Sequence, residues 1–425
     1  MKCRILGLRT GCAVLFSALT VFCYCKAASS CAPDKKLTPS IREVRQLHVN
    51  AQIMSLSLSS TKNIAAVALS NGTVQVFALD SGRTEKEILF GVRRSDAAQE
   101  EAGSEIIRVR FSPIANILAV SYLSRIYLFE CDTWKQIGAL GVEGEDTPKW
   151  NSEGQPIDKS VAPTQKPERD PFHEYVRRSA LGDGRLRVTD FAFSPDGSKV
   201  LAGYCRGTCN VALPYWSYVN AHAGGDDPVR LWDLQTGGLI WQRMFDADLV
   251  ITRVVIEPRG QFFAASTTMV NAERYVYLHE LSTGRRIWTL PPFYEGFDVP
   301  MIFTPDGAKL ITILSEAAGG EKLYYQHLGI YDVTSGQKVG ELRDRHGASN
   351  ADLTPDGKWL AAQMWSEPGF QLWDLDRGAA VSKKRPSGFY WRRRFTDIIR
   401  FSPDGQLLVV GNSIDGRLAI LEFQH

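Results

Sequence analysis

The chain has 425 residues, of which 44% are hydrophobic and 23% are charged, and its 49 Lys and Arg nearly balance its 47 Asp and Glu. This composition excludes a disordered or fibrous protein and provides enough apolar material for a large core. The balanced charge argues against a nucleic-acid-binding protein. We therefore expect a globular chain with no nucleic-acid partner.

The first 27 residues have the order of a secretory signal peptide. A basic start is followed by an apolar run to about Cys25 and by small residues around Ala27. This order predicts cleavage after Ala27 and a linker over residues 28–40. The alternatives are an uncleaved N-terminal anchor and lipidation at Cys31, either of which would add a membrane contact. We expect an exported protein that is periplasmic, envelope-associated or secreted.

Only three cysteines follow Cys31, namely Cys131, Cys205 and Cys209. In an oxidising compartment, the short spacing of the last two predicts a structural disulfide between Cys205 and Cys209. Metal binding by this pair is not expected, because no second pair of Cys or His stands at a suitable spacing. Cys131 falls in an apolar strand pattern and is predicted to be a buried small hydrophobic residue.

Seven related stretches repeat along the chain, the first around Leu58. Five of them carry a proline–glycine turn, as in FSPDG at 193–197 and 401–405, and two degenerate copies precede these five. Each turn separates two alternating apolar runs, and a third run follows with its own closing turn, as in VRLWDLQTGG at 229–238. The pattern predicts antiparallel strands joined by tight turns. The period of about 50 residues indicates a repeat architecture.

These repeats resemble the WD-repeat β-propeller family. The resemblance rests on the LWD triplets at 231–233 and 372–374, on the turns after them and on the recurrent S/T-P-D-G turns. It implies an all-β fold over residues 41–425, a seven-bladed β-propeller of four-stranded antiparallel blades. His279 stands where two repeats have Trp, and it is predicted to be a packed core residue.

The two ends of the repeat region predict how the ring closes. The last repeat stops at its third strand, while the strand-like segment 41–49 belongs to no repeat. We therefore expect this N-terminal strand to complete the last blade.

The connections predict two unlike faces of the disc. With strands a to d counted outward from the axis, the a–b and c–d turns lie on one face and are short. The long connections lie on the other face: insertions at about 141–185 and 205–228, and segments at 315–327 and 383–395. Because long loops often carry function, we expect the binding surface there.

Two of these connections hold the candidate partner-binding residues. Those of the 205–228 insertion are Tyr215, Trp216, Tyr218, His222, Asp226 and Asp227. Those of the basic segment are Phe389, Tyr390, Trp391, Arg392, Arg393 and Arg394. The basic and aromatic mixture suits anionic lipid headgroups, acidic glycans or an acidic protein patch. The alternative for both segments is structural, as a cap on the disc or as packing between blades.

No nucleophile, phosphate-loop or metal-ligand motif occurs in the sequence. We predict a non-enzymatic interaction or scaffold propeller of the cell envelope or exterior, without cofactor or metal, that binds a protein or an envelope polymer as a monomer. The alternative is a propeller enzyme, such as a lactonase-like hydrolase or a dehydrogenase, with its site at the mouth of the central channel.

Overall fold

A computed structural model gives the fold. It describes residues 39–90, 107–142, 186–206, 228–244, 249–269, 273–290, 293–294, 299–317, 324–343, 348–364, 369–387, 398–412 and 414–424. The predicted signal peptide (1–27) and most of the predicted linker (28–40) lie outside these residues and stay predictions.

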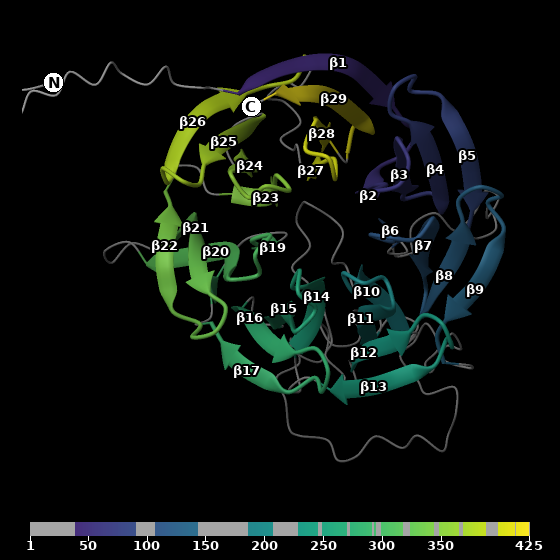
Figure 1. Ribbon diagram of the computed structural model, residues 1–425, viewed down its shortest axis with the longest axis horizontal. Helices are drawn as coiled ribbons and strands as arrows, with labels where there is room; N and C mark the ends of the chain where they lie inside the picture. The colour runs from purple at the N-terminus through teal and green to yellow at the C-terminus, as the bar shows by residue number, and fades with distance from the viewer. Residues whose placement is uncertain are drawn as a thin grey trace, which may run out of the picture. The chain divides into compact units, whose positions relative to one another are not determined.

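The residues from Pro39 onward form a seven-bladed β-propeller (Figure 1). Each blade has four antiparallel strands from the axis outward, in chain order except that β1 (Ser40–His48) is the outermost strand of blade 7, and blade 4 carries β18 (Phe293–Tyr294) as a fifth strand. The described residues contain no helix. The predicted all-β fold class is therefore confirmed.

The blades follow one another around the ring in sequence order. Blade 1 consists of β2 (Ile53–Leu58), β3 (Ile64–Leu69), β4 (Thr73–Ala78) and β5 (Thr84–Leu89). Blade 2 consists of β6 (Arg108–Phe111), β7 (Ile117–Tyr122), β8 (Arg125–Glu130) and β9 (Gln136–Leu140). Blade 3 consists of β10 (Leu186–Phe193), β11 (Lys199–Arg206), β12 (Pro228–Asp233) and β13 (Leu239–Met244). Blade 4 consists of β14 (Leu249–Ile256), β15 (Phe262–Met269), β16 (Glu273–Glu280) and β17 (Arg286–Thr289), and β18 (Phe293–Tyr294) also pairs with β16. Blade 5 consists of β19 (Met301–Phe303), β20 (Lys309–Ala317), β21 (Tyr324–Asp332) and β22 (Lys338–Leu342). Blade 6 consists of β23 (Ala348–Leu353), β24 (Trp359–Met364), β25 (Phe370–Asp374) and β26 (Ala379–Lys384). Blade 7 consists of β27 (Ile398–Phe401), β28 (Leu407–Asn412), β29 (Arg417–Gln424) and β1 (Ser40–His48).

The N-terminal strand closes the ring, as predicted. β1 pairs antiparallel with β29, from Ser40 opposite Gln424 to His48 opposite Arg417, and becomes the outermost strand of blade 7. Leu47 of β1 is buried with side chains of blades 1 and 7. The two ends of the described chain are thus joined by a strand ladder rather than left as open edges.

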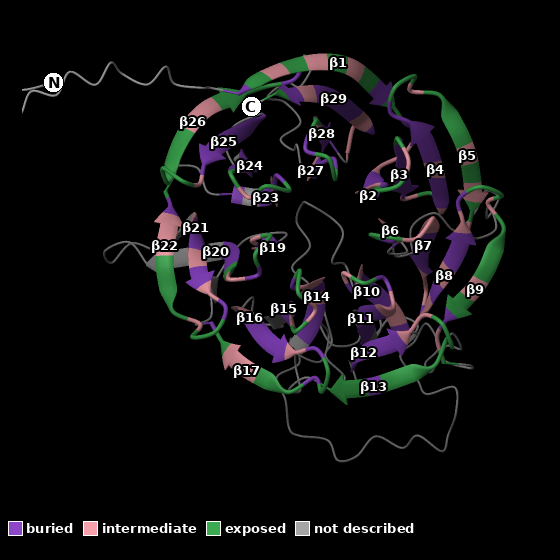
Figure 2. Cartoon of the chain, viewed as in Figure 1, coloured by how far each residue is buried: buried purple, intermediate pink, exposed green. Residues whose placement is uncertain are grey.

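The core consists of seven apolar clusters, each between two neighbouring blades. The inner strands are largely buried, whereas the outermost strands expose most of their residues, as β5 and β13 show (Figure 2). This difference is expected, because an inner strand has a neighbouring blade packed on each face, whereas an outermost strand lies at the rim and faces solvent. Cys131 and His279 are both buried, as predicted.

The S/T-P-D-G turns owe their shape to side-chain hydrogen bonds. In the turn of blade 3, the Ser194 hydroxyl donates to Asp196 and accepts the Lys199 backbone N–H at 2.9 Å, while Gly197 has a φ of 64°. Only glycine adopts that φ without strain. The hydrogen bond from Ser194, together with those from the hydroxyl and backbone N–H of Ser198, lowers the pKa of Asp196 to about 2.

Two expected connections are shorter than the sequence suggested. In blade 5, the ladder between β20 and β21 continues to Ala317 opposite Tyr324, so most of the expected loop at 315–327 is a long hairpin. In blade 6, Lys383 and Lys384 belong to β26, where they pair with Gln371 and Phe370. Polar residues in both segments give no clear apolar alternation, so the sequence pattern predicts loops where the strands continue.

Candidate functional site

The predicted partner-binding residues lie outside the described residues. These are Tyr215, Trp216, Tyr218, His222, Asp226, Asp227, Phe389, Tyr390, Trp391, Arg392, Arg393 and Arg394. Their roles in binding stay predictions.

The 205–228 insertion begins at a buried position. Cys205 is buried at the end of β11 and is disulfide-bonded, whereas Cys131 is a free thiol. Next to it, the Tyr204 ring is fully buried with the Arg230 guanidinium 4.7 Å from its centroid. The predicted partner of Cys205, Cys209, lies outside the described residues, so that pairing stays a prediction.

The described residues enclose a cavity of about 60 Å³ on the propeller axis. The residues that line it come from the innermost strands of six blades: Met54, Ser55, Leu56, Arg108, Arg110, Asp190, Thr252, Arg253, Asn350, Ile398 and Arg400. Four guanidinium groups face one carboxylate in this lining. The cavity is therefore strongly cationic, and we refer to it as the channel site.

Each inner strand places its side chains in the channel site by the same rule. In six blades, the lining residue is the third before the end of the inner strand: Ser55, Arg108, Asp190, Arg253, Asn350 and Ile398. In four of them the strand pairing shifts register directly before that residue, as between Val188 and Asp190 and between Ile251 and Arg253. Such a β-bulge turns the following side chains toward a new direction.

Arg108 and Arg110 of β6 connect three blades. The Arg108 guanidinium donates to the backbone carbonyls of Met54 at 2.5 Å and Thr189 at 3.1 Å, on either side of its own blade. The Arg110 guanidinium donates to Ser55 Oγ at 3.2 Å and to Asp190 Oδ1 at 3.0 Å. Both guanidinium groups are therefore fixed on one wall of the channel site.

Asp190 is nearly fully buried and is held from two sides. Its Oδ1 accepts from Arg110, and its Oδ2 accepts the Val254 backbone N–H of the next blade at 3.1 Å. Both carboxylate oxygens of Asp190 thus have a hydrogen-bond donor, as a buried polar group requires. It serves as a structural link between blades 2, 3 and 4.

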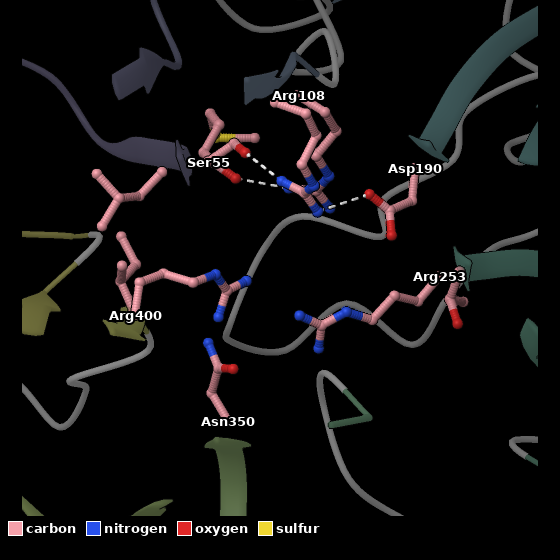
Figure 3. Close-up of a pocket in the computed structure, with 11 residues that line it drawn as sticks. Ser55, Arg108, Asp190, Arg253, Asn350 and Arg400 are labelled. Atoms are coloured by element: carbon pink, nitrogen blue, oxygen red, sulfur yellow. Dashed lines mark hydrogen bonds and ion pairs between the residues drawn. The ribbon is translucent and has the colours of Figure 1, made fainter. Parts of the chain in front are cut away.

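Three further side chains reach the cavity from other directions. Figure 3 shows Arg253, Asn350 and Arg400 pointing into the same central space from strands of blades 4, 6 and 7. Arg253 Nη1 donates to the Val299 carbonyl at 3.1 Å, and Arg400 Nη1 donates to the Ile399 carbonyl at 2.6 Å. Asn350 Oδ1 accepts the Ala351 N–H at 2.9 Å, and the amide nitrogen lies on the cavity side (Figure 3). The three face the wall formed by Arg108 and Arg110.

Asp352 follows the lining residue Asn350 by two residues on β23 and lies close to Arg400. Its Oδ2 accepts the Phe401 backbone N–H at 2.7 Å. Although part of the side chain stays exposed, burial raises the pKa of the Asp352 carboxyl, and the positive charge of Arg400 opposes this rise. The Asp352 carboxyl therefore takes up a proton at a higher pH than an ordinary aspartate does.

Within the described parts of the chain, no group of three or more His, Cys, Asp or Glu side chains is placed to hold a metal ion. The same residues include no helix that is long and apolar enough to cross a membrane.

Comparison with known protein families found no family model that matches the chain, and no curated protein matches it. The seven-bladed propeller is shown by the structure. The resemblance to the WD-repeat family is carried by the sequence motifs alone.

The repeat pattern of the sequence did not predict the channel site, although the inner strands carry a signal for it. When the repeats are aligned on their turns, the third residue before the end of each inner strand is polar or charged in five of the seven. A strand that is buried on both faces is normally apolar throughout. Arginine at this position in two repeats, with two more arginines two residues further on, is therefore a functional signal.

Proposed function

We propose that this protein is a non-enzymatic binding propeller, which holds an anionic group of its ligand or partner in the channel site. The observation that carries this proposal is the convergence of Arg108, Arg110, Arg253 and Arg400 on one cavity, where the described lining residues include one carboxylate, that of Asp190. Arginine is the residue best suited to bind carboxylates and phosphates in a partly dry site, because its guanidinium stays charged and offers several donors in a fixed plane.

The geometry also favours binding over chemistry. Asp190, the carboxylate of the lining, is engaged by Arg110 and by a backbone N–H, so its oxygens act as structural acceptors. The guanidinium groups are fixed by backbone carbonyls, which prepares the site for a charged guest at little cost in side-chain entropy. In our proposal, the ligand is released unchanged.

The wider setting follows the sequence motifs. We propose that the chain is a WD-repeat-like propeller of the cell envelope or exterior, and that its anionic guest belongs to a protein or an envelope polymer. The connections after β9 and β11 begin and end on the face opposite the short turns, so the bulk of such a partner would contact that face.

Calorimetric titration of the purified full-length chain tests this function. The panel contains inorganic phosphate, sulfate, acetate and succinate as anions, with ethylammonium as a cationic control. We expect at least one anion to bind at one site per chain. We also expect the double variant Arg253→Gln with Arg400→Gln to lose this binding, while Arg243→Gln keeps it. Arg243 is a matched control because it also donates to a backbone carbonyl, that of Thr283, but lies on the outer strand β13.

Two results would overturn the proposal. One is that no anion of the panel binds, and the other is that the double variant binds as tightly as the parent. Conversion of a bound ligand to a product would favour the alternative, an enzyme with its site at the channel mouth.

A further inference from the structure

We propose that the group bound in the channel site is a tetrahedral oxyanion, a phosphate or sulfate, held mainly by Arg253, Arg400 and Asn350. This inference rests on the proposed function and makes it more specific, because it selects one chemical class of anion. Two kinds of ligand carry such a group: the free ion, and a monoester whose organic part extends out of the cavity.

The directions of the donors distinguish a tetrahedral anion from a planar one. A single carboxylate is satisfied by one guanidinium that presents two parallel N–H groups in its own plane. Here the donors come from three separate blades and point at a common space from different sides (Figure 3). A tetrahedral anion presents oxygens in all directions and can accept from all three at once. The acceptor positions of a carboxylate lie in one plane, so a carboxylate accepts from all three only where the donors lie near that plane.

The size of the cavity sets the upper limit of the guest. A water-sized group needs about 10–15 Å³, so a cavity of about 60 Å³ holds roughly four to six such groups. A phosphate or sulfate ion fits that space. A nucleotide or a sugar does not, so the rest of any larger ligand must lie outside the cavity.

The charge of the lining favours an anion with more than one negative charge. Four guanidinium groups surround the space, and Asp190 is the one carboxylate among the residues that line it. Since charges interact more strongly in a partly dry site than in bulk water, each further negative charge on the guest strengthens its binding. The backbone contacts of Arg108 and Arg110 keep two of the positive charges in place without requiring that they touch the guest.

Buried polar side chains support the assignment of the individual donors. Arg253 and Asn350 are 8% and 4% exposed, so each was removed from water when the ring formed. Low exposure keeps bulk water away from these donors and strengthens their interaction with an anion. A doubly charged oxyanion at the axis would interact with both side chains and with Arg400 at the same time.

Titration of the full-length chain at pH 7.5 with three phosphate probes tests the inference. The probes are inorganic phosphate, glycerol 3-phosphate and vesicles that contain phosphatidic acid, and the planar competitors are acetate and succinate. We expect phosphate or its monoester to bind at least tenfold more tightly than succinate. Binding of the soluble monoester but not of the vesicles would assign a small ligand, and binding of the vesicles would assign a lipid headgroup.

Variants at the three donors locate the site. Replacing a hydrogen bond to a charged group generally weakens binding by tenfold or more, so Arg253→Gln and Arg400→Gln should each lower phosphate affinity at least tenfold. Asn350→Asp keeps the size of the side chain but places a carboxylate opposite the guest, and it should abolish phosphate binding. Arg243→Gln should have no effect. Thermal unfolding of each variant would establish that it is folded.

The outcomes separate this inference from the proposed function. If succinate or acetate binds the channel site more tightly than phosphate, the tetrahedral assignment is wrong while the anion-binding function stands. If Asn350→Asp binds phosphate as tightly as the parent, the assignment of the donors is wrong. If no anion binds, both proposals fall together.

Discussion

The packing of the closing strand against blade 1 can be tested at a single glycine. Gly82 stands in the turn between β4 and β5 with a φ of 71°. A Cβ added there would lie 2.8 Å from Leu47 Cδ2 and 2.7 Å from Arg45 Cδ, both on β1. Gly237 occupies the same turn position in blade 3, with a φ of 69° and no atom within 4 Å of an added Cβ. Gly237→Ala is therefore a matched control for Gly82→Ala.

The two substitutions share one cost and differ in another. An L-residue in the left-handed region costs roughly 1–2 kcal/mol, and the lower chain entropy of alanine in the unfolded state offsets about 0.4–1 kcal/mol of it. These two effects are common to both positions. Gly82→Ala must also displace Leu47, which is packed in a core cluster, and Arg45, whose Nη2 donates to the Asp80 carbonyl at 2.6 Å. Overpacking of this kind costs about 1–3 kcal/mol.

We therefore expect Gly82→Ala to lower the free energy of unfolding by about 1–3 kcal/mol more than Gly237→Ala does. The measurement is urea unfolding followed by tryptophan fluorescence, with a common m-value as the condition for comparing midpoints. In a Leu47→Ala background, the excess cost of Gly82→Ala should fall, because one of the two clashing side chains has been shortened. Equal destabilisation by Gly82→Ala and Gly237→Ala would refute the reasoning.

Three further predictions follow from the fold. Deletion of residues 41–49 removes the strand that pairs with β29, so the propeller should melt far below the parental temperature, and a cooperative melt at the parental temperature would contradict ring closure by β1. Burial lowers the pKa of His279 below 6.5, so its contribution to stability is present above pH 6.5 and is lost as the pH falls below it; His279→Phe should flatten the decline in melting temperature between pH 6.5 and 5. Burial raises the pKa of the Cys131 thiol to about 11, so mass spectrometry should find the Cys131 peptide unmodified after iodoacetamide at pH 8 in the folded protein and alkylated in urea; labelling of the folded protein would contradict the assigned burial.

The pH prediction for His279 depends on its packing. Its ring stacks on Phe263 with centroids 4.9 Å apart, and Nδ1 lies 3.0 Å from the Gly284 carbonyl. The position thus accepts an aromatic side chain, as Trp232 and Trp373 show at the same place in other blades. Phenylalanine should therefore keep the packing while removing the titration. An unchanged pH dependence in the variant would show that His279 does not contribute to it.

The sequence determined the architecture because that information is local. Turn chemistry at Ser194 recurs at Thr304, Thr354 and Ser402, and alternating apolar runs flank each turn, so strand order could be read one repeat at a time. Closure could be predicted as well, since a three-strand repeat at one end and an unmatched strand at the other admit one solution. Cys131 and His279 followed from their place in the repeat.

Tertiary structure alone decided the channel site. Ser55 and Arg400 are separated by most of the chain, and only a closed ring brings them to one cavity. Their directions depend on β-bulges in the inner strands, which are set by blade-to-blade packing and leave no reliable mark in a single sequence. The sequence therefore specified which strands form, while the arginine-lined cavity arose from how seven unlike copies of one strand meet at the axis.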